Sequence, residues 1–321
     1  MSRALITGGA GFIGSHVADW LLAAGSEVVV YDDFSTGRRE FVSDLEAQPG
    51  ATVVEGDVLD EARLREALVG CEVVFHLQAN ADVRHGLEHP RRDLEQNAIA
   101  TSVLLEAMRA ERIDRIAFAS TGSVYGEPEL FPTPEECPLP IQTSLYGASK
   151  LAAEGMIGAY CHGYGFAAVA VRLVSVLGER YTHGHVFDFY RALQDDPGRL
   201  RILGDGRQRK SYLHVGDCVN GIVTALESAQ PGQLEAFNIG TDETIAVDES
   251  VALITEHMGL APRLEHTGGA RGWAGDSPLI HLDCSKLRRT GWRPELAIPE
   301  AIERTLAWFD ANPWVFEASE R

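Results

Sequence analysis

The sequence is poor in lysine and has no long hydrophobic run. Of its 28 lysine and arginine residues only three are lysines (Lys150, Lys210 and Lys286), against 47 Asp and Glu, and the formal net charge is −19. Such an acidic chain does not offer the basic patches that nucleic acids and anionic membranes require. No apolar stretch approaches the ~20 residues of a membrane-spanning helix, and no signal segment is recognisable at the N-terminus. We therefore expect a cytoplasmic protein without nucleic-acid or membrane partners.

Cysteine is also scarce and shows no metal-binding or redox spacing. The chain has no C-x-x-C pair among its five cysteines, Cys71, Cys137, Cys161, Cys218 and Cys284. An odd number without paired spacing is typical of reduced, structural thiols, and we expect no metal site. The 321 residues, 45% of them hydrophobic, are enough for two packed domains.

Short apolar runs alternate with amphipathic stretches through the first half of the chain. The runs predict strands at 4–7, 27–31, 52–55, 73–77, 116–120 and 167–173, and the stretches predict helices at 12–24, 61–69, 91–109 and 146–162. Continuously apolar strands, each followed by a helix, are typical of a parallel sheet covered on both faces. The pattern therefore predicts an α/β protein with a doubly wound parallel sheet of the Rossmann type.

Beyond residue 173 the pattern is looser. It predicts helices at 215–228, 247–258 and 299–311, a strand at 236–239 and an irregular loop at 266–278. We predict a first domain at 1–173, joined by returning segments near 212–240, and a smaller C-terminal α/β domain at 174–321.

A glycine-rich turn joins the first predicted strand to the first predicted helix. In TGGAGFIG, residues 7–14, the glycines Gly8, Gly11 and Gly14 allow a tight turn, close approach of the backbone to a pyrophosphate, and close packing of helix on strand. The free N–H groups at the start of the helix would bind the phosphates. Because strand, turn and helix follow in the required order, we interpret this segment as a dinucleotide-binding loop.

Two acidic residues end the second predicted strand. Asp32 lies eighteen residues after Gly14, and Asp33 follows it. A carboxylate at this place accepts hydrogen bonds from the adenosine ribose and repels a 2′-phosphate, which favours NAD over NADP. Arg38 and Arg39 follow closely and are the residues that a 2′-phosphate would use. We give Asp32 the greater weight and predict NAD.

A tyrosine and a lysine begin the last helix of the first half. In YGASK, Tyr146 and Lys150 are spaced i and i+4 and share one face of the helix. A cation beside a phenol is expected to lower the phenol's pKa from about 10. Such a tyrosine serves as a general base or acid towards an alcohol or sugar hydroxyl. Thr121, after the predicted strand at 116–120, offers a hydroxyl to the same chemistry.

TGGAGFIG, ASTGSVYG and YGASK together resemble, in order and spacing, the motifs of the extended short-chain dehydrogenase/reductase family, in its subgroup of nucleotide-sugar epimerases and dehydratases. The resemblance extends over almost the whole chain. It implies tightly bound NAD in domain 1–173, a sugar nucleotide in domain 174–321, and a homodimer. It also implies that Thr121, Tyr146 and Lys150 are catalytic, and that Asn97 is the helix asparagine beside them.

The expected cofactor contacts lie where the predicted strands of the first domain end, and in the loops that follow. They are Gly8, Gly11, Phe12, Ile13, Gly14, Asp32, Asp33, Ser35, Thr36, Gly37, Asp57, Val58, Leu77, Gln78, Ala79, Asn97, Ser120, Tyr146 and Lys150. Because the carboxyl ends of parallel strands share one edge of the sheet, these residues are expected to line a single site.

The segment ASTGSVYG separates the reactions of this subgroup. By resemblance, 4,6-dehydratases carry an acidic pair before Val-Tyr-Gly and UDP-glucuronate decarboxylases carry a glutamate, whereas this chain has Gly122 and Ser123. Without those carboxyl groups, elimination lacks its acid and base. We predict an NAD-dependent UDP-sugar 4-epimerase that inverts C4 through a 4-keto intermediate. The alternatives are an NAD-dependent sugar-nucleotide decarboxylase or reductase, and a non-catalytic NAD-binding regulator.

The segments expected to bind the sugar nucleotide depart from the family pattern. In RLVSVLG, residues 172–178, Ser175 is nearer to the threonine of hexuronate enzymes than to the asparagine of hexose enzymes. An arginine that hexuronate enzymes carry seven residues later is Thr182 here, which leaves Arg180, His183 and His185 as neighbouring candidates. GDGRQRKSY, residues 204–212, has Lys210 and Ser211 where the family's diphosphate segment has Arg-Asp.

The expected substrate contacts are therefore a mixture of catalytic hydroxyls and later loop residues. They are Thr121, Gly122, Ser123, Tyr146, Ser175, Arg180, His185, Val186, Lys210, Arg271 and Asp276. Two substrate pairs stay open: UDP-glucuronate with UDP-galacturonate, and UDP-glucose with UDP-galactose.

Overall fold

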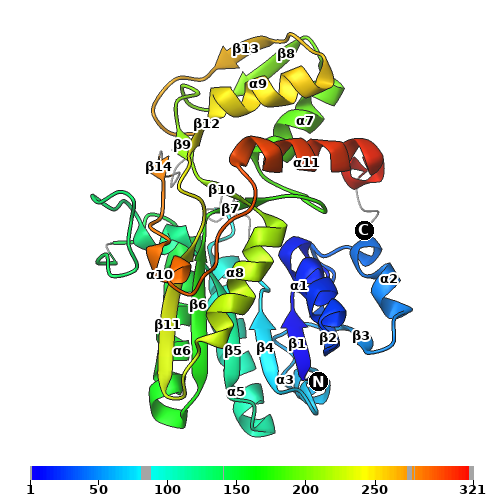
Figure 1. Ribbon diagram of the computed structural model, residues 1–321, viewed down its shortest axis with the longest axis vertical. Coiled ribbons are helices and arrows are strands. Elements are labelled where there is room, and N and C mark those ends of the chain that lie inside the picture. The colour runs from blue at the N-terminus through cyan, green and yellow to red at the C-terminus, as the bar shows by residue number, and fades with distance from the viewer. Residues whose placement is uncertain (1, 81–87, 140, 273–276, 278, 318–321) are drawn as a thin grey trace.

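The computed structural model describes residues 2–80, 88–139, 141–272, 277 and 279–317, which form a larger and a smaller lobe (Figure 1). The larger lobe is built on a seven-stranded sheet in the order β11-β6-β5-β4-β1-β2-β3, and all neighbouring strands are parallel. Its strands are β1 (Arg3–Thr7), β2 (Glu27–Asp32), β3 (Ala51–Glu55), β4 (Val73–His76), β5 (Arg115–Thr121), β6 (Ala167–Leu173) and β11 (Gln233–Ile239).

Helices cover both faces of this sheet. In β1, Ala4 and Ile6 belong to the apolar core on one face and Leu5 to the core on the other. The first face is covered by α1 (Phe12–Ala23) and α8 (Val215–Glu227), and the second by α3 (Glu61–Leu68), α5 (Ala100–Glu111) and α6 (Leu145–Tyr164). Burial on both faces explains why the strands are continuously apolar, and it confirms the predicted doubly wound fold.

The chain changes its direction across the sheet at β1. Strands β2 and β3 lie on one side of β1, and β4, β5 and β6 lie on the other, with Thr7 of β1 opposite His76 of β4. The loops after β1 and β4 therefore diverge at the carboxyl edge of the sheet, which is where open α/β sheets bind their ligands. This edge faces the smaller lobe (Figure 1).

The smaller lobe combines three helices with short strands in small sheets. The helices are α7 (His185–Asp195), α9 (Val247–Met258) and α11 (Ile298–Ala311). The strands are β7 (Ser175–Leu177), β8 (Arg199–Ile202), β9 (Arg209–Lys210), β10 (Tyr212–His214), β12 (Ile245–Ala246), β13 (Arg263–His266) and β14 (Leu279–Ile280). Short helices elsewhere in the chain include α2 (Ser43–Glu46) and α10 (Ser285–Arg288), and 3₁₀ turns lie at Arg39–Phe41, Gly122–Tyr125 and Pro313–Phe316.

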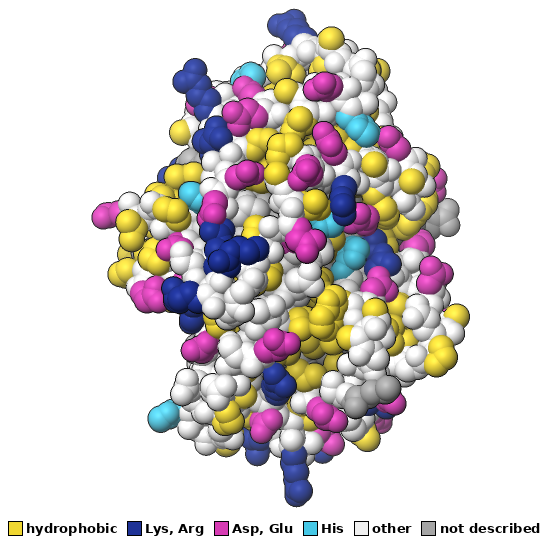
Figure 2. Space-filling model, viewed as in Figure 1, with side chains coloured by type: hydrophobic (Ala, Val, Ile, Leu, Met, Phe, Trp, Pro, Cys, Tyr) yellow, Lys and Arg dark blue, Asp and Glu magenta, His cyan; other side chains and the backbone are white. Residues whose placement is uncertain are grey.

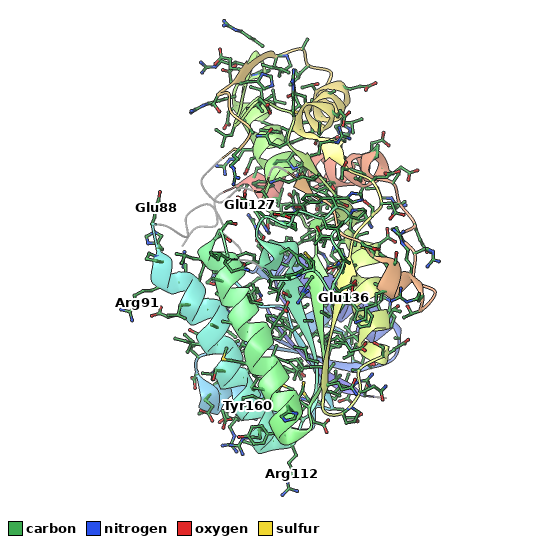
Figure 3. The ribbon with its side chains drawn as sticks, turned by 90° about the vertical axis from the view of Figure 1, so that its left-hand side faces the viewer. Glu88, Arg91, Arg112, Glu127, Glu136 and Tyr160 are labelled. Atoms are coloured by element: carbon green, nitrogen blue, oxygen red, sulfur yellow. The ribbon has the colours of Figure 1, made fainter. Side chains whose placement is uncertain are left out.

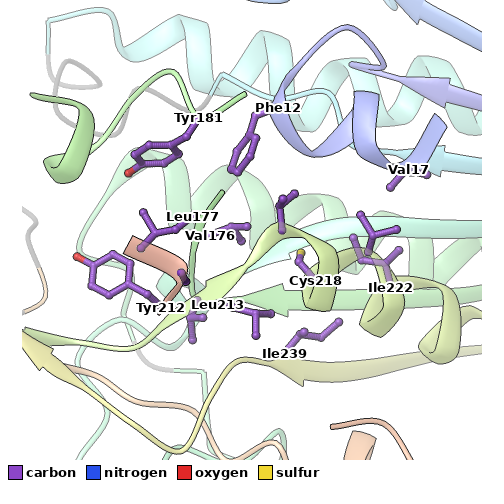
Figure 4. Close-up of a cluster of buried hydrophobic side chains, with 14 of the residues drawn as sticks. Phe12, Val17, Val176, Leu177, Tyr181, Tyr212, Leu213, Cys218, Ile222 and Ile239 are labelled. Carbon is purple, nitrogen blue, oxygen red and sulfur yellow. The ribbon is translucent and has the colours of Figure 1, made fainter. Parts of the chain in front are cut away.

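A continuous apolar core joins the lobes. Phe12, at the start of α1, meets the ring of Tyr181 edge to face, with 5.5 Å between ring centroids. Leu177, Leu213 and Ile239 extend the same cluster from the smaller lobe towards the central sheet (Figure 4). The shared core holds the smaller lobe over the carboxyl edge of the sheet.

All six strands predicted in the first half are present. The helix predicted at 91–109 is instead three consecutive segments, α4 (Pro90–Asp93), a π-helix (Leu94–Ile99) and α5. The later predicted helices correspond to α8, α9 and α11, whereas α7 and the short strands are additional to the predicted elements. Those strands have two to four residues each, which is too short for a periodic pattern. The division at residue 173 stays a prediction.

Acidic and basic side chains are interspersed over the face of the molecule shown in Figure 2. Within the described ranges, no helix has the length and apolar character needed to cross a bilayer.

Candidate active site

The turn after β1 is shaped for close contact between backbone and ligand. Gly8 has a φ of 68°, and a Cβ on it would lie 2.7 Å from the backbone of Gln78. A Cβ on Gly14 would lie 2.1 Å from the carbonyl oxygen of Gly8, so glycine is required for α1 to start so near the turn. Gly11 precedes α1 without a side-chain cap. The first N–H groups of α1 are therefore available to a pyrophosphate.

Replacing Gly14 with alanine is expected to weaken NAD binding about 10–100-fold, because the added methyl group overpacks the turn and displaces the N–H donors. Titration of the purified variant with NAD measures this loss. Gly155→Ala is the matched control, because the Cβ that it would add to α6 has no atom within 4 Å apart from its chain neighbours and the adjacent backbone of its own helix. If Gly14→Ala bound NAD as tightly as the control, the turn would not be the pyrophosphate site.

Asp32 ends β2 and is held by the glycine turn. Its Oδ2 accepts a hydrogen bond from the N–H of Ala10 (2.9 Å) and its Oδ1 accepts one from Phe34 (2.8 Å). Each carboxylate oxygen keeps a second lone pair for a ribose hydroxyl. Burial raises the pKa of Asp32, and the two N–H donors oppose that shift.

The two arginines that follow are engaged with protein groups. Arg38 donates to the carbonyl oxygen of Val315 (2.9 Å). Arg39 forms an ion pair with Glu55 and lies over the ring of Phe34. Because both guanidinium groups already have partners, the structure favours NAD, as the acid at the end of β2 predicts.

The other predicted cofactor residues differ in how much of their side chains they offer. Gln78 donates from Nε2 to Gln96 (2.7 Å), and Asp57 accepts at Oδ1 from the N–H of Leu59 (2.9 Å). The side chain of Val58 is buried in the core, which leaves only its backbone for contact with a cofactor. The loop after β2 exposes Asp33, Ser35 and Thr36, and half-buried positions are Ile13, Gly37, Leu77 and Ala79.

The carboxyl end of β5 meets the first turn of α6. Ser144 caps α6 by accepting a hydrogen bond from the N–H of Gly147 (3.0 Å). This bond fixes the start of the helix and places Tyr146 in its first turn. The hydroxyl of Thr121 lies beside that of Tyr146 and donates to that of Ser123 (3.2 Å). Three of the predicted hydroxyl groups are therefore in one place.

Lys150 lies one turn further along α6 and is almost completely buried. Its Nζ donates to the carbonyl oxygen of Ala119 (2.9 Å) and lies 4.7 Å from the centre of the Phe118 ring. Burial lowers the pKa of Lys150 to about 7, while the charges of Glu154 and Asp93 raise it.

The pKa of Tyr146 is not lowered in the way that its spacing from Lys150 predicts. Burial and the charge of Asp93 raise the pKa of Tyr146 to about 12, opposed by the neighbouring Thr121 hydroxyl. The prediction of a lowered phenol pKa is wrong for the protein groups alone, because removing the phenol from water raises its pKa.

Asn97 lies in the π-helix, where a widened turn often marks a functional site. Its Oδ1 accepts a hydrogen bond from the N–H of Asn80 (3.0 Å), and its Nδ2 donates to Ser149 (2.9 Å). Ser149 donates in turn to the carbonyl oxygen of Tyr146 (2.8 Å). Asn97 therefore supports α6 at the turn that carries Tyr146.

Three buried ionisable residues near this centre are missing from the sequence prediction. His76 is bonded to Thr7 (2.7 Å) and Thr101 (3.0 Å), and burial with the charge of Lys150 lowers its pKa to about 3. Asp93 and Glu154 act on Lys150. Only Glu154 carries a sequence signal, since it follows Lys150 by four residues on α6.

The predicted substrate residues of the smaller lobe are not all brought together. Arg180 forms an ion pair with Asp19 of α1 (2.7 Å), and Val186 is fully buried in the core. His185 is bonded to Ser250 (2.7 Å) and to the hydroxyl of Tyr212 (2.9 Å). Burial and the charge of Lys210 lower the pKa of His185 to about 3, so this ring is neutral at physiological pH.

Other predicted substrate residues lie on different segments. A Cβ on Gly122 would lie 3.5 Å from the carbonyl oxygen of Leu173, two residues before Ser175. Lys210 lies on β9, and Arg271 pairs with Glu127 (2.6 Å), which follows β5. Asp276 lies outside the described residues. Within the described part of the chain, no cluster of three or more metal-ligating side chains is present.

Comparison with known proteins agrees with this geometry. Residues 4–240 match the model of the NAD dependent epimerase/dehydratase family. A UDP-glucose 4-epimerase of Mycolicibacterium smegmatis is 35% identical over 96% of this chain and 98% of its own length.

Solved structures of similar proteins share this fold. A UDP-galactose 4-epimerase is 36% identical, with a TM-score of 0.87, over 97% of this chain and 100% of its own. A UDP-glucuronic acid 4-epimerase of Bacillus cereus, in complex with UDP-glucuronic acid and NAD, is 27% identical, with a TM-score of 0.88, over 96% and 99%.

Proposed function

Because this chain belongs to the NAD dependent epimerase/dehydratase family, we propose that it is an NAD-dependent UDP-sugar 4-epimerase that interconverts UDP-glucose and UDP-galactose. The observation that carries the proposal is that Tyr146, in the first turn of α6 and beside the hydroxyl of Thr121, has Lys150 one helical turn away. At the next two positions along the strand end, Gly122 and Ser123 supply no carboxyl group. The site thus has a base for a sugar hydroxyl without the acids of an elimination.

Tyr146, Thr121 and Lys150 have different roles in the proposed reaction. Tyr146 removes the proton from the sugar 4-hydroxyl and later returns it, and Thr121 orients the reacting oxygen by its hydrogen bond. When bound, NAD would supply the acceptor and then the donor of the C4 hydride, together with a positive ring charge. That charge and the Lys150 ammonium would both oppose the burial that raises the pKa of Tyr146.

The surroundings of Arg180 and His185 favour a neutral hexose over a hexuronate as the substrate. A C6 carboxylate needs a cation or several donors when it is removed from water. Arg180 is already paired with Asp19, and His185 is neutral. Neither of these two candidates therefore supplies a positive charge for a carboxylate.

A hexuronate is the second candidate, and the hydroxyl of Ser123 supports it. This hydroxyl lies beside Thr121 (3.2 Å) and would donate a hydrogen bond to a C6 carboxylate. Ser175 also has a small hydroxyl side chain, which is nearer to the threonine of the hexuronate enzymes than to the asparagine of the hexose enzymes. The homodimer expected from the family resemblance stays a prediction.

Incubation with separate sugar nucleotides tests the proposal. Purified protein with NAD receives UDP-glucose, UDP-N-acetylglucosamine or UDP-glucuronate, and the C4 epimers are separated by chromatography. We expect UDP-galactose from UDP-glucose, and a kcat/KM at least about tenfold lower with UDP-glucuronate.

Three other results would each replace the proposal. A higher kcat/KM with UDP-glucuronate would favour the hexuronate enzyme. Release of CO2 or net consumption of NADH would identify a decarboxylase or a reductase. NAD binding without turnover of any substrate would favour the non-catalytic regulator.

A further inference from the structure

A buried polar network lies behind the catalytic strand end. Glu154 on α6 forms an ion pair with Arg172 on β6, through bonds of 2.7 Å and 3.1 Å to the two carboxylate oxygens. The hydroxyl of Ser120 on β5 donates to the same carboxylate. Both side chains of the ion pair are only 6% exposed. A buried charge pair of this kind costs desolvation energy, so a purely stabilising role does not account for it well.

Arg172 extends the network to the segment after the catalytic strand. Its Nη1 donates to the hydroxyl of Tyr125 (2.9 Å), and that hydroxyl donates to Asn238 on β11 (2.8 Å). Tyr125 ends the 3₁₀ turn that carries Gly122 and Ser123. The ion pair therefore fixes both sides of Thr121, through Ser120 before it and the 3₁₀ turn after it.

Three successive residues of β5 are bound by three residues that share one face of α6. The carbonyl oxygen of Ala119 accepts from Lys150, the hydroxyl of Ser120 donates to Glu154, and the hydroxyl of Thr121 lies beside that of Tyr146. Positions 146, 150 and 154 are each four residues apart on the helix. The catalytic helix and the catalytic strand end are thus joined at three consecutive contacts.

We propose that Glu154 is a positioning residue for the reaction, whose carboxylate, held by Arg172, fixes the strand end that carries Thr121 against the turn of α6 that carries Lys150. It touches neither substrate nor cofactor in this assignment, and it acts through Ser120 and Lys150. The catalytic part of this inference rests on the proposed epimerase function.

The same carboxylate supports the charge on Lys150. The charged and titratable groups around Lys150 are Asp93 on α4, His76 on β4, and Tyr146 and Glu154 on α6 itself. His76 is neutral, and the charges of Glu154 and Asp93 both favour the ammonium. Without the Glu154 charge, the positive charge of Arg172 would also lack its partner, so Lys150 would lose its proton at a lower pH.

The scarcity of lysine provides a direct measurement. Because the chain has only Lys150, Lys210 and Lys286, selective ¹³Cε labelling of lysine yields three signals to titrate by NMR, and Lys150→Arg assigns one of them. In Glu154→Gln we expect the Lys150 midpoint to fall by at least about 0.5 pH unit, with Lys210 and Lys286 unchanged.

The kinetic expectation follows from the loss of positioning. Glu154→Gln is expected to lower kcat about tenfold or more with KM within about threefold, and to shift the alkaline limb of the kcat profile to lower pH. Glu111→Gln is the matched control, because it removes a carboxylate that pairs with Arg65 on the outside of the same lobe. The control is expected to change neither the three midpoints nor kcat.

Ser120→Ala covers the case in which Glu154→Gln does not fold. It removes one hydroxyl and leaves the ion pair, so we expect a lower kcat, about 3–10-fold, with an unchanged Lys150 midpoint. The inference is overturned if the folded variants keep the wild-type kcat and midpoint and lose only thermal stability. An absence of epimerisation by the wild type would refute the proposed function instead, and the Lys150 titration would still test Glu154.

Discussion

Replacing Tyr146 with phenylalanine is expected to reduce epimerisation about 10³-fold while NAD and UDP-glucose still bind. The change removes only the phenol oxygen, which lies beside the Thr121 hydroxyl and is the only proposed base for the 4-hydroxyl proton. Lys150 would be left without a phenol to act on. The rate of UDP-galactose formation, together with titration of NAD and UDP-glucose, measures the loss of catalysis separately from binding.

Tyr160→Phe is the matched control for this change. Tyr160 lies on the same helix, towards the end remote from Glu127 (Figure 3), and its hydroxyl donates to Glu106. The control is expected to keep the wild-type rate. If Tyr146→Phe also kept that rate and bound its ligands normally, another residue would have to be the base.

Replacing Lys150 with methionine is expected to lower kcat about 10²–10³-fold and at the same time to stabilise the fold near neutral pH. Activity falls because the cation that favours the phenolate is gone. Stability rises because a buried ammonium, whose pKa is lowered by its removal from water, is exchanged for an apolar chain of similar length. Thermal unfolding at saturating NAD, followed from pH 6 to pH 10, measures the second effect.

The pH dependence of that stability has a definite sign. Burial lowers the pKa of Lys150 to about 7 in the folded protein, below the 10.5 of an exposed lysine. Between these values the unfolded chain binds more protons, so the wild type gains stability from this group as the pH rises. The advantage of Lys150→Met should therefore be largest below about pH 7 and disappear towards pH 10.5. A difference in Tm that did not change with pH would contradict a buried, titrating Lys150.

The pH result also bears on which form of Lys150 is active. Arginine keeps its charge throughout this range. Lys150→Arg is therefore expected to lack any alkaline decline that comes from deprotonation of Lys150, at a lower overall rate because the larger guanidinium crowds the carbonyl of Ala119 and the ring of Phe118.

Local patterns in the sequence were sufficient for the cofactor half of the site. The glycine turn, Asp32 and the pair of Tyr146 and Lys150 depend on spacing within a few residues, or on a strand and helix adjacent along the chain. The Rossmann order of the sheet follows from the same alternation of strands and helices. For these features the structure adds distances to what the motifs predict.

The smaller lobe could not be predicted in the same way. Its strands are only two to four residues long, and strands of that length have no measurable periodicity. Its side chains are assigned by contacts between distant segments. Arg180 has a sequence environment that suits an anionic ligand, yet it pairs with Asp19, 161 residues earlier.

The sequence by itself determined the fold of the first half, and its motifs predicted NAD and the pair of Tyr146 and Lys150, because these features depend on short-range periodicity and spacing. Only the tertiary structure decided the charge of His185, the opposing pKa shifts of Tyr146 and Lys150, and the contact of Glu154 with Ser120 and Arg172. The physical reason is burial. How far a group is removed from water, and which distant group it then meets, is set by packing between segments and cannot be read from neighbouring residues.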